Sequence, residues 1–93
     1  MLRWLGTIAG RVTDADTELP LAGAAIRAST PDALPIADTT TDVNGRYEMA
    51  LPAGTYDVYA SISGYEESSR RGVVVRWVDK VKVEVDFALA RRQ

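Results

Sequence analysis

Four oxygen-bearing side chains are the candidates for metal chemistry in this chain: Asp14, Asp16, Asp42 and Asn44. Asp14 and Asp16 lie in a loop that begins where an expected strand ends, and Asp42 and Asn44 lie in an expected turn. The four could hold calcium if both loops lie at one end of the fold. Calcium takes about six to eight oxygens, and this set offers few carboxylates and no EF-hand spacing. We favour the simpler interpretation that these side chains bind their own turn backbone, and we expect no metal and no cofactor.

Three aromatic side chains are candidates for partner contact: Tyr59, Trp4 and Trp77. Tyr59 faces outward on the parity that buries Val58 and Ala60, and an exposed aromatic ring can stack on a sugar or anchor a protein. Each tryptophan shares the parity of the inward positions in its own segment, so we favour a place for both at the edge of the core. The opposite register of Trp77 remains an alternative.

Groups that could catalyse a reaction are scarce. The chain contains no histidine and no cysteine. Zinc sites and activated serine nucleophiles usually depend on imidazole, and a thiolate nucleophile needs cysteine. We therefore expect that this protein is not an enzyme.

Length and composition indicate one ordinary folded domain that covers residues 1–93. The chain has 93 residues, of which 46% are hydrophobic and 26% are charged, with a net charge of −2. Such a composition argues against disorder. The negative charge argues against nucleic acid as a partner, and the lack of a long apolar run argues against insertion into a membrane.

Apolar and polar residues alternate with the period of two that is typical of half-buried strands. The expected strands cover residues 6–14, 22–29, 36–41, 47–51, 56–62, 66–77 and 81–89. The short, threonine-rich segment 36–41 is expected at a sheet edge. With turns between the segments and no helical period, the pattern predicts an all-β fold, a seven-stranded antiparallel β-sandwich of the Ig-like type.

Two turns separate the middle strands. Asn44 and Gly45 favour a turn over residues 42–45 because both tolerate positive φ. The stretch from Pro52 to Gly54 is expected to close a hairpin between 47–51 and 56–62, with Tyr56 pointing into the core.

Six short motifs, in order, resemble the carboxypeptidase regulatory-like domain. They are Gly10-x-Val12, Pro20-Leu21-x-Gly23-Ala24-x-Ile26, Thr41-Asp42-x-x-Gly45-x-Tyr47, Leu51-Pro52-Ala53-Gly54-x-Tyr56, Ser63-Gly64-Tyr65 and Val85-Asp86-Phe87-x-Leu89. The resemblance implies a transthyretin-like, or prealbumin-like, sandwich that is related to Cna B-type and starch-binding-like domains. It also implies a non-catalytic module, and the matched positions are turn and core residues.

Two chemistries of neighbouring families do not transfer to this chain. Cna B-type repeats can form a Lys–Asn isopeptide bond, but the only lysines here are Lys80 and Lys82, both late, and the single asparagine is Asn44, in a turn. Transthyretin-related hydrolases use histidines, which this chain lacks.

The resulting expectation is a structural or interaction module that spaces or docks neighbouring domains, or a protein partner, in a larger surface or secreted protein. One alternative is a carbohydrate-binding module, with a glycan bound by two or more coplanar exposed aromatics. A second alternative is a standalone decoration or cement protein of a virus or phage particle. The first interpretation places the protein outside the cell or on its surface; if Met1 is the native start, the virion surface or the cytoplasm is expected.

Overall fold

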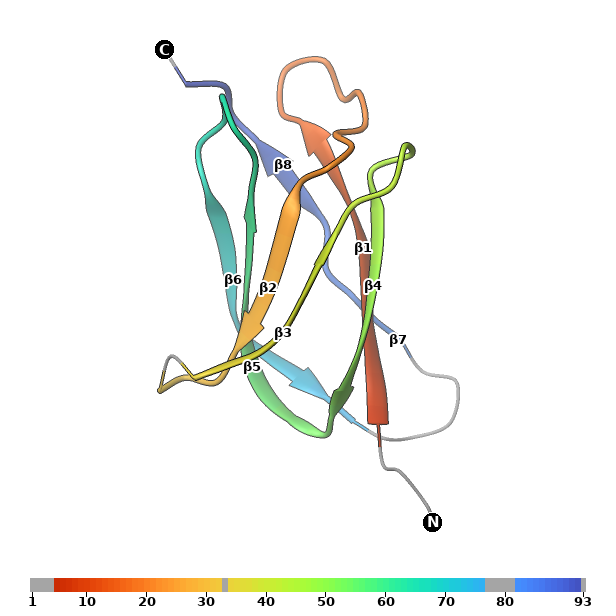
Figure 1. Cartoon of the computed structure of the whole chain (residues 1–93), viewed down its shortest axis with the longest axis vertical. Helices are drawn as coiled ribbons and strands as arrows, with labels where there is room; N and C mark the ends of the chain where they lie inside the picture. The colour runs from red at the N-terminus through yellow and green to blue at the C-terminus, as the bar shows by residue number, and fades with distance from the viewer. Residues whose placement is uncertain (1–4, 33, 77–81, 93) are drawn as a thin grey trace.

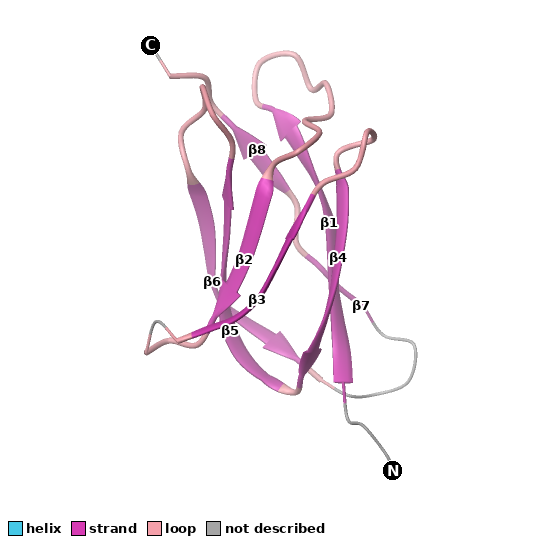
Figure 2. Cartoon of the chain, viewed as in Figure 1, coloured by secondary structure: helices cyan, strands magenta, loops and turns pink. Residues whose placement is uncertain are grey.

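The computed structural model describes residues 5–32, 34–76 and 82–92. Within these residues the secondary structure consists of strands joined by loops and turns, without a helix (Figure 2). The strands are β1 (Leu5–Asp14), β2 (Ala25–Ser29), β3 (Pro35–Thr40), β4 (Arg46–Pro52), β5 (Gly54–Ser61), β6 (Ser68–Val75), β7 (Lys82–Glu84) and β8 (Phe87–Leu89). None of the described residues belongs to a helix that could cross a bilayer.

The strands form two sheets that pack face to face (Figure 1). In the first sheet β1 is central: it pairs antiparallel with β4 on one side, and parallel with β7 and then β8 on the other. The second sheet has the order β3-β2-β5-β6 and is antiparallel throughout. The predicted class, an all-β sandwich, is confirmed.

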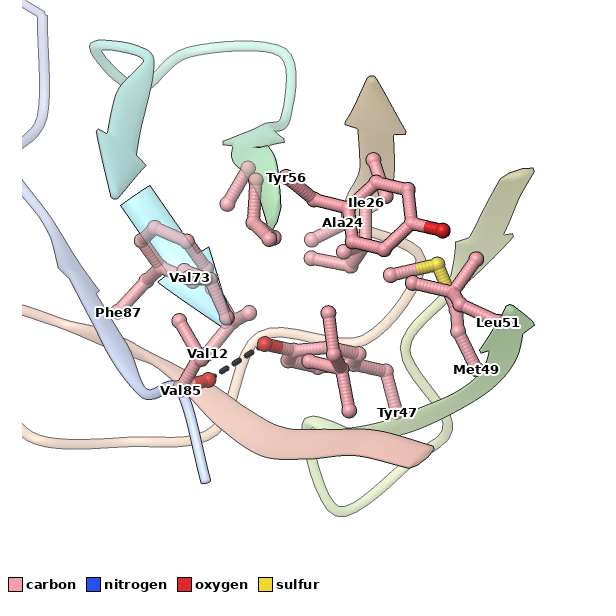
Figure 3. Close-up of a cluster of buried hydrophobic side chains, with 14 of the residues drawn as sticks. Val12, Ala24, Ile26, Tyr47, Met49, Leu51, Tyr56, Val73, Val85 and Phe87 are labelled. Carbon is pink, nitrogen blue, oxygen red and sulfur yellow. Dashed lines mark hydrogen bonds between the residues drawn. The ribbon is translucent and has the colours of Figure 1, made fainter. Parts of the chain in front are cut away.

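The core lies between the sheets and is built from the inward positions that the alternation predicts. Its buried residues include Ile8 and Val12 of β1, Ile26 of β2, Tyr47, Met49 and Leu51 of β4, Tyr56 and Val58 of β5, Val73 and Val75 of β6, and Val85, Phe87 and Leu89 near the C-terminus. The Tyr47 side chain lies in this core, and its hydroxyl donates to the carbonyl of Val85 (Figure 3). Burial, the largest cause, and the charge of Asp86 raise the pKa of Tyr47 far above its usual range.

The last part of the chain differs from the single antiparallel strand expected over 81–89. It forms two short strands, β7 and β8, and both run parallel to β1. The described part of the sandwich therefore has eight strands, and the expected count of seven and the purely antiparallel pairing are wrong. Alternation alone does not contain this information, because it is the same for a strand of either direction.

The gap between β7 and β8 lies where the chain passes very close to Gly10. A Cβ atom at Gly10 would lie 1.9 Å from the carbonyl oxygen of Val85, so only glycine fits there. At this point the Asp86 carboxylate accepts the N–H of Arg11 at 2.9 Å, in place of a backbone carbonyl. The pairing then resumes in the same register, which advances from Ala9 opposite Glu84 to Val12 opposite Phe87.

The expected hairpin around Pro52 is also wrong, because the two strands that flank it belong to different sheets. β4 pairs with β1, whereas β5 pairs with β2 and β6. The residues from Pro52 to Gly54 form a corner that carries the chain from one layer to the other. Tyr56 is buried as expected, and its hydroxyl donates to the carbonyl of Pro52 at 2.6 Å, which fixes the corner.

β3 is an edge strand, as predicted, and it is irregular. Ala28 of β2 faces Ala37, but the next residue, Ser29, faces Pro35, so Ile36 bulges out of the ladder. A proline and a bulge both weaken the ability of a free edge to accept another strand.

The described chain begins and ends at opposite ends of the long axis (Figure 1). β1 starts at the lower end of the view, and the chain leaves β8 toward Arg92 at the upper end. The molecule extends over 47 × 27 × 17 Å.

Candidate functional site

The buried carboxylate of Asp14, at the upper end of β1, has more hydrogen-bond partners than any other described side chain. Its Oδ1 accepts the N–H groups of Asp16 at 2.7 Å and Thr17 at 3.1 Å. Its Oδ2 accepts the Tyr65 hydroxyl at 2.7 Å and Arg91 Nε at 3.0 Å. We call the group of Asp14, Tyr65 and Arg91 the Asp14 clasp.

These donors keep Asp14 ionised. The hydrogen bond from Tyr65 is the largest cause, followed by that from the Thr17 N–H, and they hold the pKa of Asp14 far below its usual range although burial opposes them. Because Asp14 is only 2% exposed, an ionised carboxylate there depends on its donors.

The Asp14 clasp joins three segments that are distant in sequence: the end of β1, the turn after β5 and the residues after β8. Backbone bonds reinforce it: Glu66 N–H donates to the carbonyl of Ala90 at 2.8 Å, and Arg92 N–H donates to that of Gly64 at 3.0 Å. The clasp thus fixes the last described residues against both sheets. Its geometry is structural, since every partner of Asp14 is a group that holds the chain in place.

The Asp42 carboxylate also accepts backbone hydrogen bonds, within its own turn. Its Oδ1 accepts the N–H groups of Asn44 at 2.8 Å and Arg46 at 3.0 Å, and these bonds, that of Arg46 first, lower the pKa of Asp42. Gly45 in the same turn has a φ of +73°, as the turn prediction requires. A Cβ there would also lie 2.6 Å from the Val12 carbonyl, so the turn packs directly on β1.

The two loops that carry the calcium candidates lie at one end of the sandwich. The Val12 N–H donates to the carbonyl of Gly45 at 2.8 Å, and the Leu21 N–H donates to the carbonyl of Val12 at 2.9 Å. The described residues nevertheless contain no group of three or more His, Cys, Asp or Glu side chains suited to a metal. Asp14 and Asp42 each bind backbone N–H groups of their own loop. Calcium binding, the alternative that we disfavour from the sequence, is untested, and this geometry does not favour it.

Tyr59 is on the outer face of the second sheet and is half-buried. It stands directly opposite Arg27 of β2. The two side chains line a shallow groove of about 320 Å³ with Ala25, Ser29, Pro35, Ser61 and Glu67. Trp4 and Trp77 lie outside the described residues, so Tyr59 is the one of the three aromatic candidates whose position is known here. Its contact role stays a prediction.

The outer face of the first sheet is charged. A groove of about 550 Å³ there is lined by residues that include Arg11, Arg46, Glu48, Lys82 and Glu84. Lys82 Nζ and Glu48 Oε2 form an ion pair across this face, and both side chains are more than half exposed. Exposed pairs of this kind contribute little to stability, so the face is a solvated surface in the isolated chain.

The fold and the Asp14 clasp define a β-sandwich whose polar groups hold loops and the residues after β8 in place. Residues 7–90 match the model of the family described as the carboxypeptidase regulatory-like domain. The chain belongs to this family, as the order of its turn and core motifs predicts.

Known proteins extend the comparison. "Structural protein 27" of a virus (isolate Australia/Victoria) is 34% identical over 85 residues, which are 91% of this chain and 15% of that protein. The chain therefore spans about 15% of the length of this curated relative.

Solved structures share the fold. The group B streptococcus pilus 2b backbone protein superposes with a TM-score of 0.69 and 16% identity over 92% of this chain and 41% of that one. The 5-hydroxyisourate hydrolase of Klebsiella pneumoniae superposes with a TM-score of 0.69 and 20% identity over 95% of this chain and 92% of that one. One of these proteins is structural and the other is an enzyme, so the shared fold does not by itself assign an activity.

Proposed function

We propose that this chain is a non-catalytic structural module, a rigid sandwich that spaces and docks neighbouring domains of a structural protein on the surface of a virus particle. The observation that carries the proposal is the path of the chain. It enters at one end of a body 47 Å long and leaves at the other, so the module separates whatever is attached at its two ends.

The interior supports a scaffold role. Apolar side chains fill the space between the sheets, and the buried polar side chains of Asp14 and Thr41 bond to the backbone of nearby loops. Thr41, for example, is buried, donates from its hydroxyl to the carbonyl of Leu21 at 2.6 Å and accepts the N–H of Ala24 at 2.9 Å. The sequence also lacks the histidine and cysteine on which many hydrolytic sites depend.

The viral relative supports the location. It is called a structural protein, and the similarity extends over most of this chain. A β-sandwich can serve such a protein through its shape and its attachments alone. We therefore place the module on the particle surface, where it contacts neighbouring domains or proteins.

Immunoelectron microscopy tests this function. An antiserum raised against the purified chain is applied to intact particles and to disrupted particles from the culture that produces the protein. Label on the outside of intact particles is the expected result. Label confined to soluble cell material, with none on either particle preparation, contradicts the proposal. Antiserum that has first been adsorbed with the purified chain is the control.

A glycan site is the second candidate function, and the Tyr59 groove is the observation that favours it. The tyrosine offers a ring face, and Arg27, Ser61 and Glu67 offer polar groups around it. Binding to a glycan array by the chain, lost in Tyr59→Ala while the melting temperature is unchanged, would support this site. Absence of binding to every glycan on the array would remove it.

A further inference from the structure

The first and last strands of the described chain are neighbours and run in the same direction. β1 pairs in parallel with β7 at Thr7, Ile8 and Ala9 and, after the gap at Gly10, with β8 at Val12, Thr13 and Asp14. The chain enters at the beginning of β1 and leaves beyond the end of β8, at the opposite end of the molecule (Figure 1). These strands are thus the two through which any attached neighbour would pull.

The direction of that pull relative to the strands decides how the hydrogen bonds break. A force that separates the two chain ends moves β1 one way along its axis and β8 the other way. The strands must then slide past each other, so the ladder bonds between them carry the load together. If the same two strands were pulled apart at one end, the bonds would break one after another.

Further contacts extend the sliding interface beyond the two short ladders. Val85 N–H donates to the carbonyl of Ala9 at 2.9 Å, and Ala15 N–H donates to that of Leu89 at 2.9 Å. The bond between Arg11 N–H and Asp86 Oδ1 bridges the gap between β7 and β8. The interface is therefore continuous from β7 to the end of β1.

Two further contacts resist sliding: the pairing of β1 with β4, and the ion pair of Arg91 with Asp14. On its other side β1 pairs with β4 from Leu5 opposite Pro52 to Arg11 opposite Arg46, so β1 is held in the sheet along most of its length. At the exit of the chain, the ion pair of Arg91 with Asp14, at 3.0 Å, ties the residues after β8 to the end of β1.

We propose that the parallel pairing of β1 with β7 and β8 makes this module a tension-bearing link, which resists forces applied through its two chain ends. The use of this property in a particle rests on the proposed structural function. The mechanical property itself rests only on topology and register. The sandwich would thus have two roles. It separates its neighbours, and it keeps them connected when a force pulls on them.

Single-molecule pulling in two directions tests the proposal on one and the same fold. Since the chain has no cysteine, handles can be attached at introduced cysteines only. The first form carries a cysteine at each end of the chain, so that β1 and β8 slide. The second form carries Asp16→Cys and the C-terminal cysteine, both at the upper end, so that β8 is peeled from β1. Asp16 is exposed, and its backbone N–H donates to Asp14 Oδ1, a bond that the substitution keeps.

The unfolding force is expected to be ~2-fold or more higher in the sliding direction than in the peeling direction, at the same pulling speed. Sliding breaks the ladder bonds together, and forced unfolding reports the height of that barrier. Both forms should have the same melting temperature, which excludes a difference in stability as the cause. Equal forces in the two directions, or a higher force on peeling, would overturn the proposal. The labelling of particles is unaffected by this result, so failure of the mechanical role and failure of the particle location are separate outcomes.

Discussion

Gly10 of β1 lies against the backbone of Val85, whose carbonyl oxygen occupies the position that a side chain on residue 10 would need. This contact occurs where the last part of the chain passes from β7 to β8. Because Gly10 has no Cβ, both β7 and β8 can lie along β1. A substitution at this position is therefore a direct test of the architecture.

Gly10→Ala is expected to destabilise the fold, because the added Cβ would meet Val85 O at 1.9 Å and the backbone must shift. Overpacking of this kind costs about 1–3 kcal/mol or more. The free energy of unfolding from urea titration measures it. Gly54→Ala is the matched control, since its Cβ would meet nothing closer than 3.6 Å. Equal stability of the two variants would contradict the close approach.

Arg91→Ala is expected to lower the melting temperature by more than Arg92→Ala. The Arg91 side chain donates to the carboxylate of buried Asp14. The adjacent Arg92 donates its backbone N–H to the carbonyl of Gly64, and an alanine at this position keeps that bond. Removal of one partner leaves a buried carboxylate short of a donor, and that is costly. Thermal unfolding followed by circular dichroism makes the comparison. A larger loss in Arg92→Ala would show that the Asp14 clasp does not hold the C-terminal end.

Acid should destabilise the protein through Asp14 and Asp42. The pKa of each is lowered in the folded state from an ordinary 3.8. The stability that they contribute is therefore present above that value and is lost as the pH falls toward the folded pKa, because the unfolded chain binds protons first. Urea titrations between neutral pH and pH 2 measure the loss. Asp14→Asn should be less stable at neutral pH and should show a shallower decline. A decline as steep as that of the parent chain would rule out Asp14 as its source.

Alkali should act through Tyr47. Its pKa is raised in the folded state from an ordinary 10.0, so the stability is fully present below that value and is lost as the pH rises toward the folded pKa. Tyr47→Phe should cost about 1 kcal/mol at neutral pH, because the hydrogen bond to Val85 is lost. It should also be less sensitive to alkali than the parent chain. Ultraviolet absorbance of tyrosinate, followed together with unfolding, checks this prediction, and ionisation of Tyr47 well before unfolding would contradict it.

The inward faces of the strands could be predicted from sequence, because burial on one side imposes a period of two. Tyr47, Met49 and Leu51 illustrate this for β4, and Val73 and Val75 establish the register of β6. Pairing partners could not be predicted in the same way. Both sheets turn their inner faces to one core, so Leu51 and Tyr56 are buried whether the corner between them closes a hairpin or joins two layers.

The candidate site was predicted in part. A turn role for Asp14 follows from its place at the end of a strand, and its bonds to Asp16 and Thr17 agree with that role. Its bonds to Tyr65 and Arg91 join residues 51 and 77 positions away in sequence. A single sequence does not relate such distant positions. The nearest signal was the family motif Ser63-Gly64-Tyr65, which contains the tyrosine but indicates no partner for it.

The bulge at Ile36 and the missing N–H of Pro35 have a consequence for crowding. A straight, open edge on β3 would offer any neighbouring molecule a template on which to add a strand, and sheets could then grow from one copy to the next. Because β3 is kinked and lacks a donor at its start, this route to fused sheets is hindered. Copies held close together would therefore tend to remain separate folded bodies and not merge into fibres.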